Sequence, residues 1–170
     1  HGPVLRGKYA TYAMRYANYE DIRVIEQWYR MNKAANLKEW KSAMQMMSIP
    51  MFGTGYADKE GNILYLYNAK LPIRAEGYNW QGVLPGNSSK VMWTEYLPYE
   101  DLPQVLNPKS GFIQNCNNTP FMTTTGEDNP IYEKYSKTFG IESHMSNRAL
   151  RALELFGKDD LISNSDFEQY

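Results

Sequence analysis

The chain has 170 residues, of which 42% are hydrophobic and 14% aromatic, enough for one ordinary domain with a packed core. Its 18 basic and 19 acidic residues nearly cancel and form no block of Lys or Arg, so the charge pattern does not indicate nucleic acid or an anionic membrane. The single cysteine excludes an internal disulfide and a thiolate metal cluster. No signal peptide, lipid motif or membrane-length apolar run appears in the sequence.

The first part of the chain predicts extended structure followed by a helix. Val4–Tyr19 is rich in Tyr, Thr and Val without helical periodicity, which favours extended chain with a turn at Arg6–Lys8. A helix is predicted from about Asp21 to Ala34, because apolar residues then recur at helical spacing. We expect one apolar face on this helix, made of Ile22, Ile25, Trp28 and Tyr29.

A second helix is predicted at Leu37–Met47, where Asn36 and Glu39 form a cap and Pro50 ends the helix. Its apolar stripe is rich in methionine and consists of Leu37, Trp40, Met44 and Met47. A stripe of this kind can line a pocket for an acyl chain, but it more often serves plain core packing. The sequence therefore favours a core position for this helix.

A β-hairpin is predicted from Met51–Asp58 and Ile63–Tyr67, around a turn at Lys59–Gly61. Three side chains at this turn resemble part of a calcium-binding loop, namely Asp58, Glu60 and Asn62. The number of ligands is too low for such a loop. A turn that caps its own backbone is the better interpretation.

The middle of the chain is predicted to be mostly irregular. Residues 69–110 contain Gly, Pro, Asn and Ser throughout, so we expect a long loop that covers a partner element or surrounds a site. The chain is then expected to return as a short strand at Phe112–Asn115, ahead of the polar stretch Thr123–Asn129.

The last part of the chain is predicted to be mainly helical. A helical piece is expected at Ile131–Phe139 and a longer helix at Ser146–Phe156. Ser146 caps the longer helix and Gly157 closes it, and a new amphipathic segment begins in Leu161–Tyr170. Together the elements give the fold class α+β, with strands, two or three helices and one long irregular loop.

Leu97–Pro120 is a segment rich in residues that fix the backbone, with prolines at both ends and an amide cluster between them. The cluster consists of Gln114, Asn115, Asn117 and Asn118. An Asn in this position could donate to a developing oxyanion, since its NH2 group offers two hydrogens without proton exchange. Amide-rich loops more often satisfy their own backbone, and on chemistry alone the sequence favours that interpretation.

Other catalytic and metal-binding patterns have little support. His1 and His144 are far apart and no Gly-x-Ser-x-Gly elbow appears, so neither a Ser/His/Asp triad nor a zinc site is indicated. Cys116 is interpreted as a small side chain between two amides, since an internal Cys lacks the free α-amino group that activates an N-terminal nucleophile. Glycosidases use a pair of carboxylates at a fixed distance from each other. Three carboxylates could suggest such a pair, namely Glu95, Glu100 and Asp101, but the loop that contains them does not fix the distance between them.

The motif PYEDLPQVLNPKSGFIQNCN at Pro98–Asn117 resembles the middle of the large chain of the penicillin acylase family, whose members are N-terminal-nucleophile amidohydrolases. Other stretches resemble the same family in the same order, namely His1–Val4, Ile49–Ile63, Leu71–Arg74, and Met92–Trp93 followed by Leu97–Pro98. The resemblance covers nearly the whole chain. It is closest to the branch that removes acyl chains from acyl-homoserine lactones and lipopeptides.

The resemblance implies roles for four residues. Asn117 matches the Asn whose side-chain amide forms half of the oxyanion hole, the other half being a backbone N–H outside this chain. Arg148 matches an Arg that organises both the nucleophile and the oxyanion-hole Asn, through the fixed fork of its guanidinium. The alternative is a solvated residue at the start of a helix, where the positive end of the helix dipole disfavours a cation. Met51 and Phe52 match the strand that lines the acyl pocket, with plain core packing as the alternative. Gly53 stands where relatives usually carry Asn.

The resemblance also implies what the parent protein is. We expect residues 1–170 to be a single fragment of an N-terminal-nucleophile (Ntn) hydrolase catalytic domain, truncated at both ends, with the αββα sandwich fold. An N-terminal Ser outside this chain would cleave N-acylated small molecules such as penicillins or acyl-homoserine lactones, and the isolated chain would be inactive. No cofactor is expected, although a structural calcium ion is compatible with the parent.

The expected partners are the N-acyl substrate, the small (alpha) chain and the remainder of the large (beta) chain, with neither nucleic acid nor membrane among them. The resemblance places the parent in the periplasm or outside the cell, after autoproteolytic processing. The alternative is a non-catalytic module that binds carbohydrate or peptide through its tyrosines and its long loop. A nucleophile encoded upstream of this chain would favour the enzyme over the module.

Overall fold

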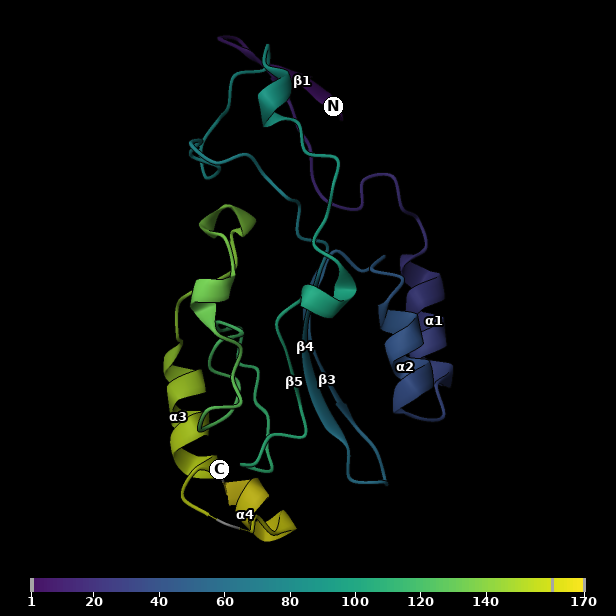
Figure 1. Cartoon of the computed structure of the whole chain (residues 1–170), viewed down its shortest axis with the longest axis vertical. Coiled ribbons are helices and arrows are strands. Elements are labelled where there is room, and N and C mark those ends of the chain that lie inside the picture. The colour runs from purple at the N-terminus through teal and green to yellow at the C-terminus, as the bar shows by residue number, and fades with distance from the viewer. Residues whose placement is uncertain (1, 160, 170) are drawn as a thin grey trace. The chain divides into compact units, whose positions relative to one another are not determined.

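The computed structural model describes residues 2–159 and 161–169 and combines α-helices with two small sheets (Figure 1). The α+β class predicted from the sequence is therefore confirmed. The elements divide between two compact units. The first unit holds the described residues up to Met51, together with Asn68–Asp101 and Tyr135–Gly140; the second holds Phe52–Tyr67, Leu102–Lys134 and the described residues from Ile141 onward.

The first unit opens with a short antiparallel hairpin of β1 (Val4–Arg6) and β2 (Thr11–Ala13). The amide of Gly7 donates to the carbonyl oxygen of Ala10 at 2.8 Å and closes the turn between the strands. The side chains of both strands are exposed, so the pair buries little apolar surface of its own. The extended structure and the early turn are as predicted.

Helix α1 (Val24–Lys33) lies within the predicted range, but its apolar face is not buried. Ile22, just before the helix, is 92% exposed, and Ile25 is 77% exposed. Trp28 and Tyr29 are exposed as well. Periodicity finds an apolar face without saying what covers it, and the described residues leave this one open. The sequence thus predicts the helix and its apolar residues, while the structure shows that these side chains are exposed in the described part of the chain.

In the described helix α1, Gln27 is fully buried. Its side chain forms hydrogen bonds with backbone amides of the segment that follows the next helix. Its Oε1 atom accepts hydrogen bonds from the amides of Ser48 and Ile49 at 2.7 and 2.9 Å. A buried polar side chain is stable where it is hydrogen-bonded in this way. Gln27 thus attaches α1 to the segment that leads into the first long strand.

Gln27→Leu is expected to lower the free energy of unfolding of the full-length protein by roughly 2–6 kcal/mol, since each of two buried N–H groups left without an acceptor costs about 1–3 kcal/mol. Chemical denaturation followed by circular dichroism measures the change. Gln45→Leu is the matched control, because Gln45 is exposed and donates to Glu100 at 3.3 Å. The control is expected to stay within about 0.5 kcal/mol of the unchanged protein. Equal losses in the two variants would contradict the assignment.

Helix α2 (Leu37–Met44) begins with the predicted cap. Oδ1 of Asn36 accepts the amide of Glu39 at 3.0 Å, and Oε2 of Glu39 accepts the amide of Ala35 at 2.9 Å. The helix ends before its predicted limit, because Met47 has a φ of 48° and cannot continue it. Of the methionine-rich stripe, Trp40 and Met44 are buried, which agrees with core packing.

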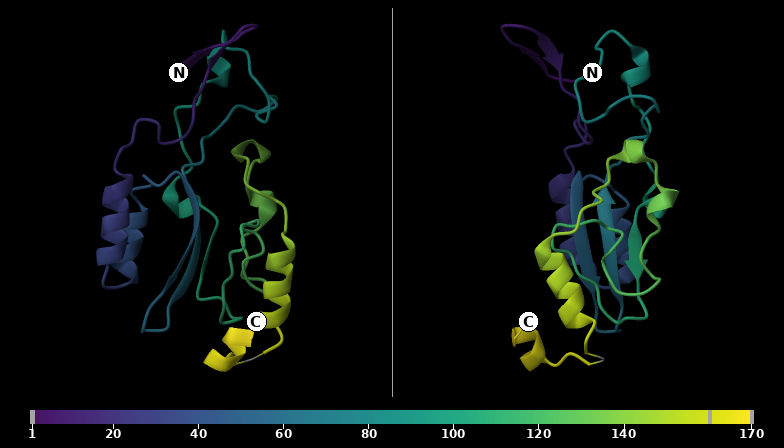
Figure 2. Two further views of the ribbon diagram at one scale, coloured as in Figure 1. Left: turned by 180° about the vertical axis from the view of Figure 1, so that it is seen from behind. Right: turned by 90° about the vertical axis from the view of Figure 1, so that its left-hand side faces the viewer.

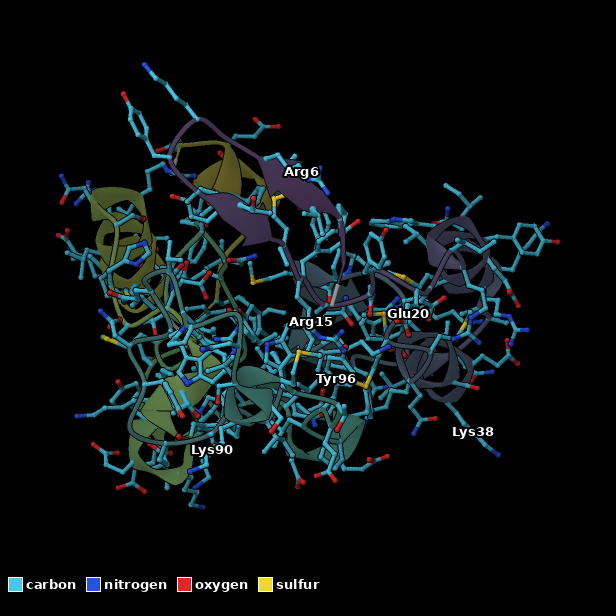
Figure 3. All side chains as sticks on the ribbon, turned by 90° about the horizontal axis from the view of Figure 1, so that it is seen from above. Arg6, Arg15, Glu20, Lys38, Lys90 and Tyr96 are labelled. Carbon is cyan, nitrogen blue, oxygen red and sulfur yellow. The ribbon has the colours of Figure 1, made fainter. Side chains whose placement is uncertain are left out.

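Residues 69–101 form the irregular part of the first unit, as the sequence predicts. Cations lie over aromatic rings of this segment, with Arg15 over Trp93 at 4.4 Å, Lys70 over Tyr96 at 4.8 Å and Arg74 over Trp80 at 5.4 Å. Arg15, Glu20 and Tyr96, all labelled in Figure 3, line a cavity of about 290 Å³. Ring faces attract these cations, so the contacts help to order a segment that has little regular hydrogen bonding.

The second unit contains a sheet with the strand order β3–β4–β5 (Figure 2). Its strands are β3 (Met51–Ala57), β4 (Ile63–Ala69) and β5 (Gln104–Leu106). β4 and β5 are antiparallel, with Tyr65 opposite Val105. The residues of β4 from Leu64 onward are all buried, which is the pattern of a central strand covered on both faces.

The turn between β3 and β4 is held by its own side chains. Oδ1 of Asp58 accepts the backbone amide of Asn62 at 2.9 Å, and Oδ2 accepts the side-chain amide of Asn62 at 2.9 Å and the hydroxyl of Tyr56 at 3.0 Å. Burial of the carboxylate is the largest single influence on the pKa of Asp58 and raises it. The hydrogen bonds together outweigh burial, so the pKa lies below its ordinary value. The carboxylate is used by the turn, so the self-capping interpretation is confirmed.

One predicted strand is wrong, and one short strand was not predicted. Residues 69–110 were expected to be mostly irregular, yet they contain β5; an edge strand tolerates Pro at its start, and the Pro103 carbonyl accepts the amide of Tyr67 at 2.9 Å. The predicted strand at Phe112–Asn115 is irregular instead. The amide of Gln114 donates to the carbonyl of Thr123 at 2.7 Å, so this segment is held by another loop rather than by the sheet.

The helical piece predicted at Ile131–Phe139 is not continuous. It consists of two short 3-10 turns, Tyr132–Lys134 and Lys137–Phe139. Ser136 lies between them with extended backbone, and its Oγ accepts the amide of Thr138 at 3.2 Å. A Ser that caps the following turn interrupts a helix, which explains the break.

Helix α3 (Asn147–Phe156) confirms the longer predicted helix, and α4 (Asn164–Gln169) follows it. Oγ of Ser146 accepts the amide of Ala149 at 3.2 Å as the predicted cap. Ala149 is fully buried, whereas the next residue, Leu150, is 50% exposed. None of the helices in the described part of the chain has both the length and the apolar character that crossing a membrane requires.

Candidate oxyanion site

Three of the four amide side chains in the cluster satisfy their own loop. Gln114 donates through Nε2 to a loop carbonyl at 2.7 Å. Oδ1 of Asn118 accepts the amide of Cys116 at 2.9 Å, and Oδ1 of Asn115 accepts the amide of Asn117 at 3.2 Å. Such bonds are what amide-rich turns commonly make. For Gln114 and Asn118 the structural interpretation is sufficient, whereas Asn115 also bonds a residue outside the loop.

Asn117 differs from its neighbours in both backbone and side chain. Its φ of 57° lies in the left-handed region, which Asn enters more easily than most residues. Its Oδ1 atom accepts a hydrogen bond from Nη2 of Arg148 at 2.9 Å. Among residues 2–159 and 161–169, no hydrogen bond engages its Nδ2 atom. Two amide hydrogens are thus left for an acceptor from elsewhere.

Arg148, the second residue of α3, determines which end of that amide is presented. A guanidinium can only donate, so Asn117 must turn its oxygen toward Arg148 and its NH2 group away. The same Nη2 atom donates to the carbonyl of Cys116 at 3.1 Å, and Oγ of Ser146 donates to that carbonyl at 3.2 Å. The family resemblance implied hydrogen bonds from the fixed fork of the guanidinium, whereas one nitrogen, Nη2, donates to both oxygens here.

The two residues predicted to be catalytic are therefore in direct contact, although 31 positions separate them in the sequence. The result is a neutral amide donor whose oxygen is held by a cation and whose backbone is fixed by a loop. A preset donor of this kind can stabilise negative charge that develops on an oxygen atom, at no cost of reorganisation.

Comparison with known proteins places the chain in a family. The family model described as penicillin amidase matches residues 1–170. The chain belongs to the penicillin amidase family. Penicillin G acylase of Escherichia coli is 35% identical to it over 126 residues, which cover 71% of this chain and 14% of that protein. The acyl-homoserine lactone acylase PvdQ of Pseudomonas putida is 26% identical over 175 residues, which cover 89% of this chain and 22% of that protein.

A solved penicillin G acylase has a similar fold. The thermostable penicillin G acylase from Alcaligenes faecalis matches with a TM-score of 0.71 at 23% identity, over 98% of this chain and 28% of that chain. The expected family resemblance and the Ntn-hydrolase fold are confirmed. This chain spans less than a third of the length of these relatives.

Met51 and Phe52, which the family resemblance assigned to an acyl pocket, lie at the start of β3. Met51 is 55% exposed and Phe52 is 53% exposed, so neither belongs to the core of the described chain. Gly53, the next residue, contacts the amide cluster: its carbonyl oxygen accepts Nδ2 of Asn115 at 3.1 Å. The departure noticed in the sequence at Gly53 thus adjoins the candidate site, and the sequence alone gave no sign of this contact.

A buried tyrosine pair in the second unit was also missed. The hydroxyl of Tyr67 donates to Oε2 of Glu142. Burial, and then this hydrogen bond, raise the pKa of Tyr67 far above its ordinary value. The pKa of Tyr65 is raised as well, first by burial and then by the charge of Glu142. Both phenols stay neutral at physiological pH. Their spacing of two residues in a strand places them on one face, which is a readable signal, but nothing in the sequence indicated Glu142.

Beside Arg148, the second unit contains a groove of about 530 Å³. It is lined mainly by α3 and α4, with Cys116, Arg148, Arg151, Leu155, Phe156 and Phe167. Cys116 is half-buried there, as expected for a small filling side chain. Over the described ranges 2–159 and 161–169, no group of three or more His, Cys, Asp or Glu residues is placed to hold a metal ion.

Proposed function

We propose that the parent of this chain is a penicillin-acylase-type amidohydrolase in which Asn117 supplies one donor of the oxyanion hole. The observation that carries the proposal is the fixed amide of Asn117, with Oδ1 bound to Arg148 at 2.9 Å and Nδ2 left for an external acceptor. Membership of the penicillin amidase family supports the same chemistry. The site is shared with parts of the protein outside this chain.

In this mechanism an N-terminal Ser outside the chain attacks the carbonyl carbon of an N-acyl amide, with its own α-amino group as the base. The carbonyl oxygen gains negative charge in the tetrahedral intermediate. Nδ2 of Asn117 donates to that oxygen, and a backbone N–H outside the chain provides the second donor. Expulsion of the amine leaves an acyl-enzyme, which water hydrolyses to the free acid.

The substrate class is an N-acylated small molecule with an apolar acyl group, such as a penicillin or an acyl-homoserine lactone. Relatives named as penicillin G acylase and as acyl-homoserine lactone acylase support these two examples. The half-exposed side chains of Met51 and Phe52 would contribute to the acyl pocket, because an apolar strand end that the chain itself does not bury can contact an apolar ligand. The small chain of the same precursor would complete the enzyme, in the periplasm or outside the cell.

N-terminal sequencing of the large chain, after expression of the full-length protein, tests the proposal. A new N-terminus at Ser, upstream of residue 1, is the expected result and would show that the precursor is cut to expose this nucleophile. An uncut precursor that lacks Ser, Thr or Cys in that region would contradict the proposal. Saturable glycan or peptide binding by such a precursor would identify it as a binding module instead.

The isolated 170-residue chain is expected to be inactive toward N-acyl substrates, because the nucleophile, its amine base and one oxyanion donor lie elsewhere. Release of phenylacetate from penicillin G, measured with the purified chain and with the full-length protein, checks this. Cys116→Ala is the control, since it removes the one thiol in the chain. Hydrolysis by the isolated chain that survives this change would show that the chemistry does not need the missing parts.

A further inference from the structure

We propose that Asn115 is a positioning residue that sets the direction of the Asn117 amide, and that Gly53 provides the space in which Asn115 works. The inference rests on the oxyanion role proposed for Asn117. Asn115 joins two parts of the second unit: Nδ2 donates to the Gly53 carbonyl of β3 at 3.1 Å, and Oδ1 accepts the amide of Asn117 at 3.2 Å. One side chain thus connects the sheet to the backbone of the proposed oxyanion donor.

In this chain, the absence of a side chain at position 53 leaves the space that Asn115 occupies. A Cβ atom there would lie 2.5 Å from Nδ2 and 3.1 Å from Cγ of Asn115, and 3.2 Å from the hydroxyl of Tyr65. Cβ atoms essentially never approach other heavy atoms as closely as 2.5 Å, so any larger residue must displace the Asn115 amide. Tyr65 is fully buried in β4 and cannot move aside. Gly53 therefore allows the amide to lie directly against the strand.

Asn117 is held at two points, one on its backbone and one on its side chain. Its φ of 57° is a conformation that Asn adopts in loops, and the contacts around it fix how the residue is presented. Asn115 holds the backbone N–H of Asn117, and Arg148 holds the side-chain oxygen at 2.9 Å. The direction of Nδ2 follows from these two constraints together. A displacement of about 1 Å in a catalytic group can lower a rate by as much as about 10²-fold, so the backbone constraint matters for activity.

A double-mutant cycle in the full-length enzyme tests the inference. Asn115→Ala and Gly53→Ala are each expected to lower kcat by about 10-fold, less than complete loss of an oxyanion donor, with little change in KM. In an Asn117→Ala background, where no amide remains to be positioned, each is expected to cost no more than about 2-fold further. Such loss of effect is the signature of a residue that acts through Asn117, and a merely structural role would not produce it.

Asn129→Ala is the matched control. Oδ1 of Asn129 accepts the amides of Thr123 and Thr124 at 2.8 and 3.2 Å, so it holds a neighbouring loop with no bond to Asn117. Whatever kcat loss this control causes is expected to multiply with that of Asn117→Ala. Thermal melts of every variant establish that it is folded, and Asn115→Ala carries the test if Gly53→Ala does not fold.

The outcomes separate the two claims. An Asn117→Ala enzyme with full activity overturns the proposed function, and with it any positioning role. If Asn117→Ala is strongly impaired but Asn115→Ala costs the same factor with and without it, the positioning inference alone is overturned. An Asn115→Ala single variant with unchanged kcat has the same consequence.

Discussion

Replacing Asn117 with Ala in the full-length enzyme is expected to lower kcat by about 10²–10³-fold, the range seen when one donor of an oxyanion hole is removed. The expected loss is in kcat rather than KM, because the amide donates most strongly once negative charge has formed on the substrate oxygen. The structure favours a large effect: Oδ1 is already bound to Arg148, so Nδ2 needs no reorientation during the reaction. Steady-state hydrolysis of one N-acyl substrate measures the change.

Asn87→Ala serves as the control for this experiment, since Asn87 is an exposed residue of the first unit. Its kcat is expected to stay within about 2-fold of the unchanged enzyme, as for surface substitutions away from a site. Asn117→Asp is a sharper probe, because a carboxylate keeps the shape and can still pair with Arg148. It offers no donor and places negative charge beside the oxyanion, so a loss at least as large as for Ala is expected. Activity close to normal in either Asn117 variant would remove this residue from the mechanism.

Sequence reasoning located the features whose cause is local. The Asn36–Glu39 cap and the Ser146 cap are hydrogen bonds across three residues, and both are present at 3.0 and 3.2 Å. The turn at Asp58–Asn62 is equally local and was interpreted correctly. Local chemistry of this kind is fully specified by neighbouring residues, so it can be read without knowledge of the fold.

Features that depend on distant partners were not readable in this way. The burial of Gln27 depends on backbone amides 21 and 22 positions away, so helical periodicity gave no sign of it. The edge strand β5 exists because β4 offers it a partner, whatever its own flanking prolines suggest. Strand formation is decided largely by pairing across the sheet, which a local pattern does not contain.

The candidate site shows the same division. Composition and spacing gave only an amide-rich loop, and the contact of Asn117 with Arg148 was expected solely from family resemblance. The structure adds what the resemblance lacked: the use of a single guanidinium nitrogen, and the contact of Asn115 with Gly53. A residue noticed as a departure from the family pattern became interpretable only when its neighbour 62 positions away was known.

Arg148→Ala in the full-length enzyme is expected to lower kcat by about 10²-fold, because misdirection of a catalytic group can cost that much even when the group itself remains. Without the guanidinium, Oδ1 of Asn117 and the carbonyl of Cys116 lose their common donor, at 2.9 and 3.1 Å. The Asn117 amide can then rotate and present its oxygen where its NH2 group is needed. Comparison of kcat and KM for one N-acyl substrate measures the effect.

Stability separates this role from a structural one. Arg148 lies in the first turn of α3, where the positive end of the helix dipole disfavours a cation, so its removal is not expected to destabilise the helix. Arg148→Lys is the informative partner variant. Since one nitrogen serves both oxygens, an ammonium that reaches them can replace it, and a loss well below that of Arg148→Ala is expected. If Arg148→Ala lowers the melting temperature in proportion to activity, the guanidinium does not act by orienting Asn117. If Lys and Ala are equally impaired, a single cationic donor is not sufficient and the planar guanidinium itself is needed.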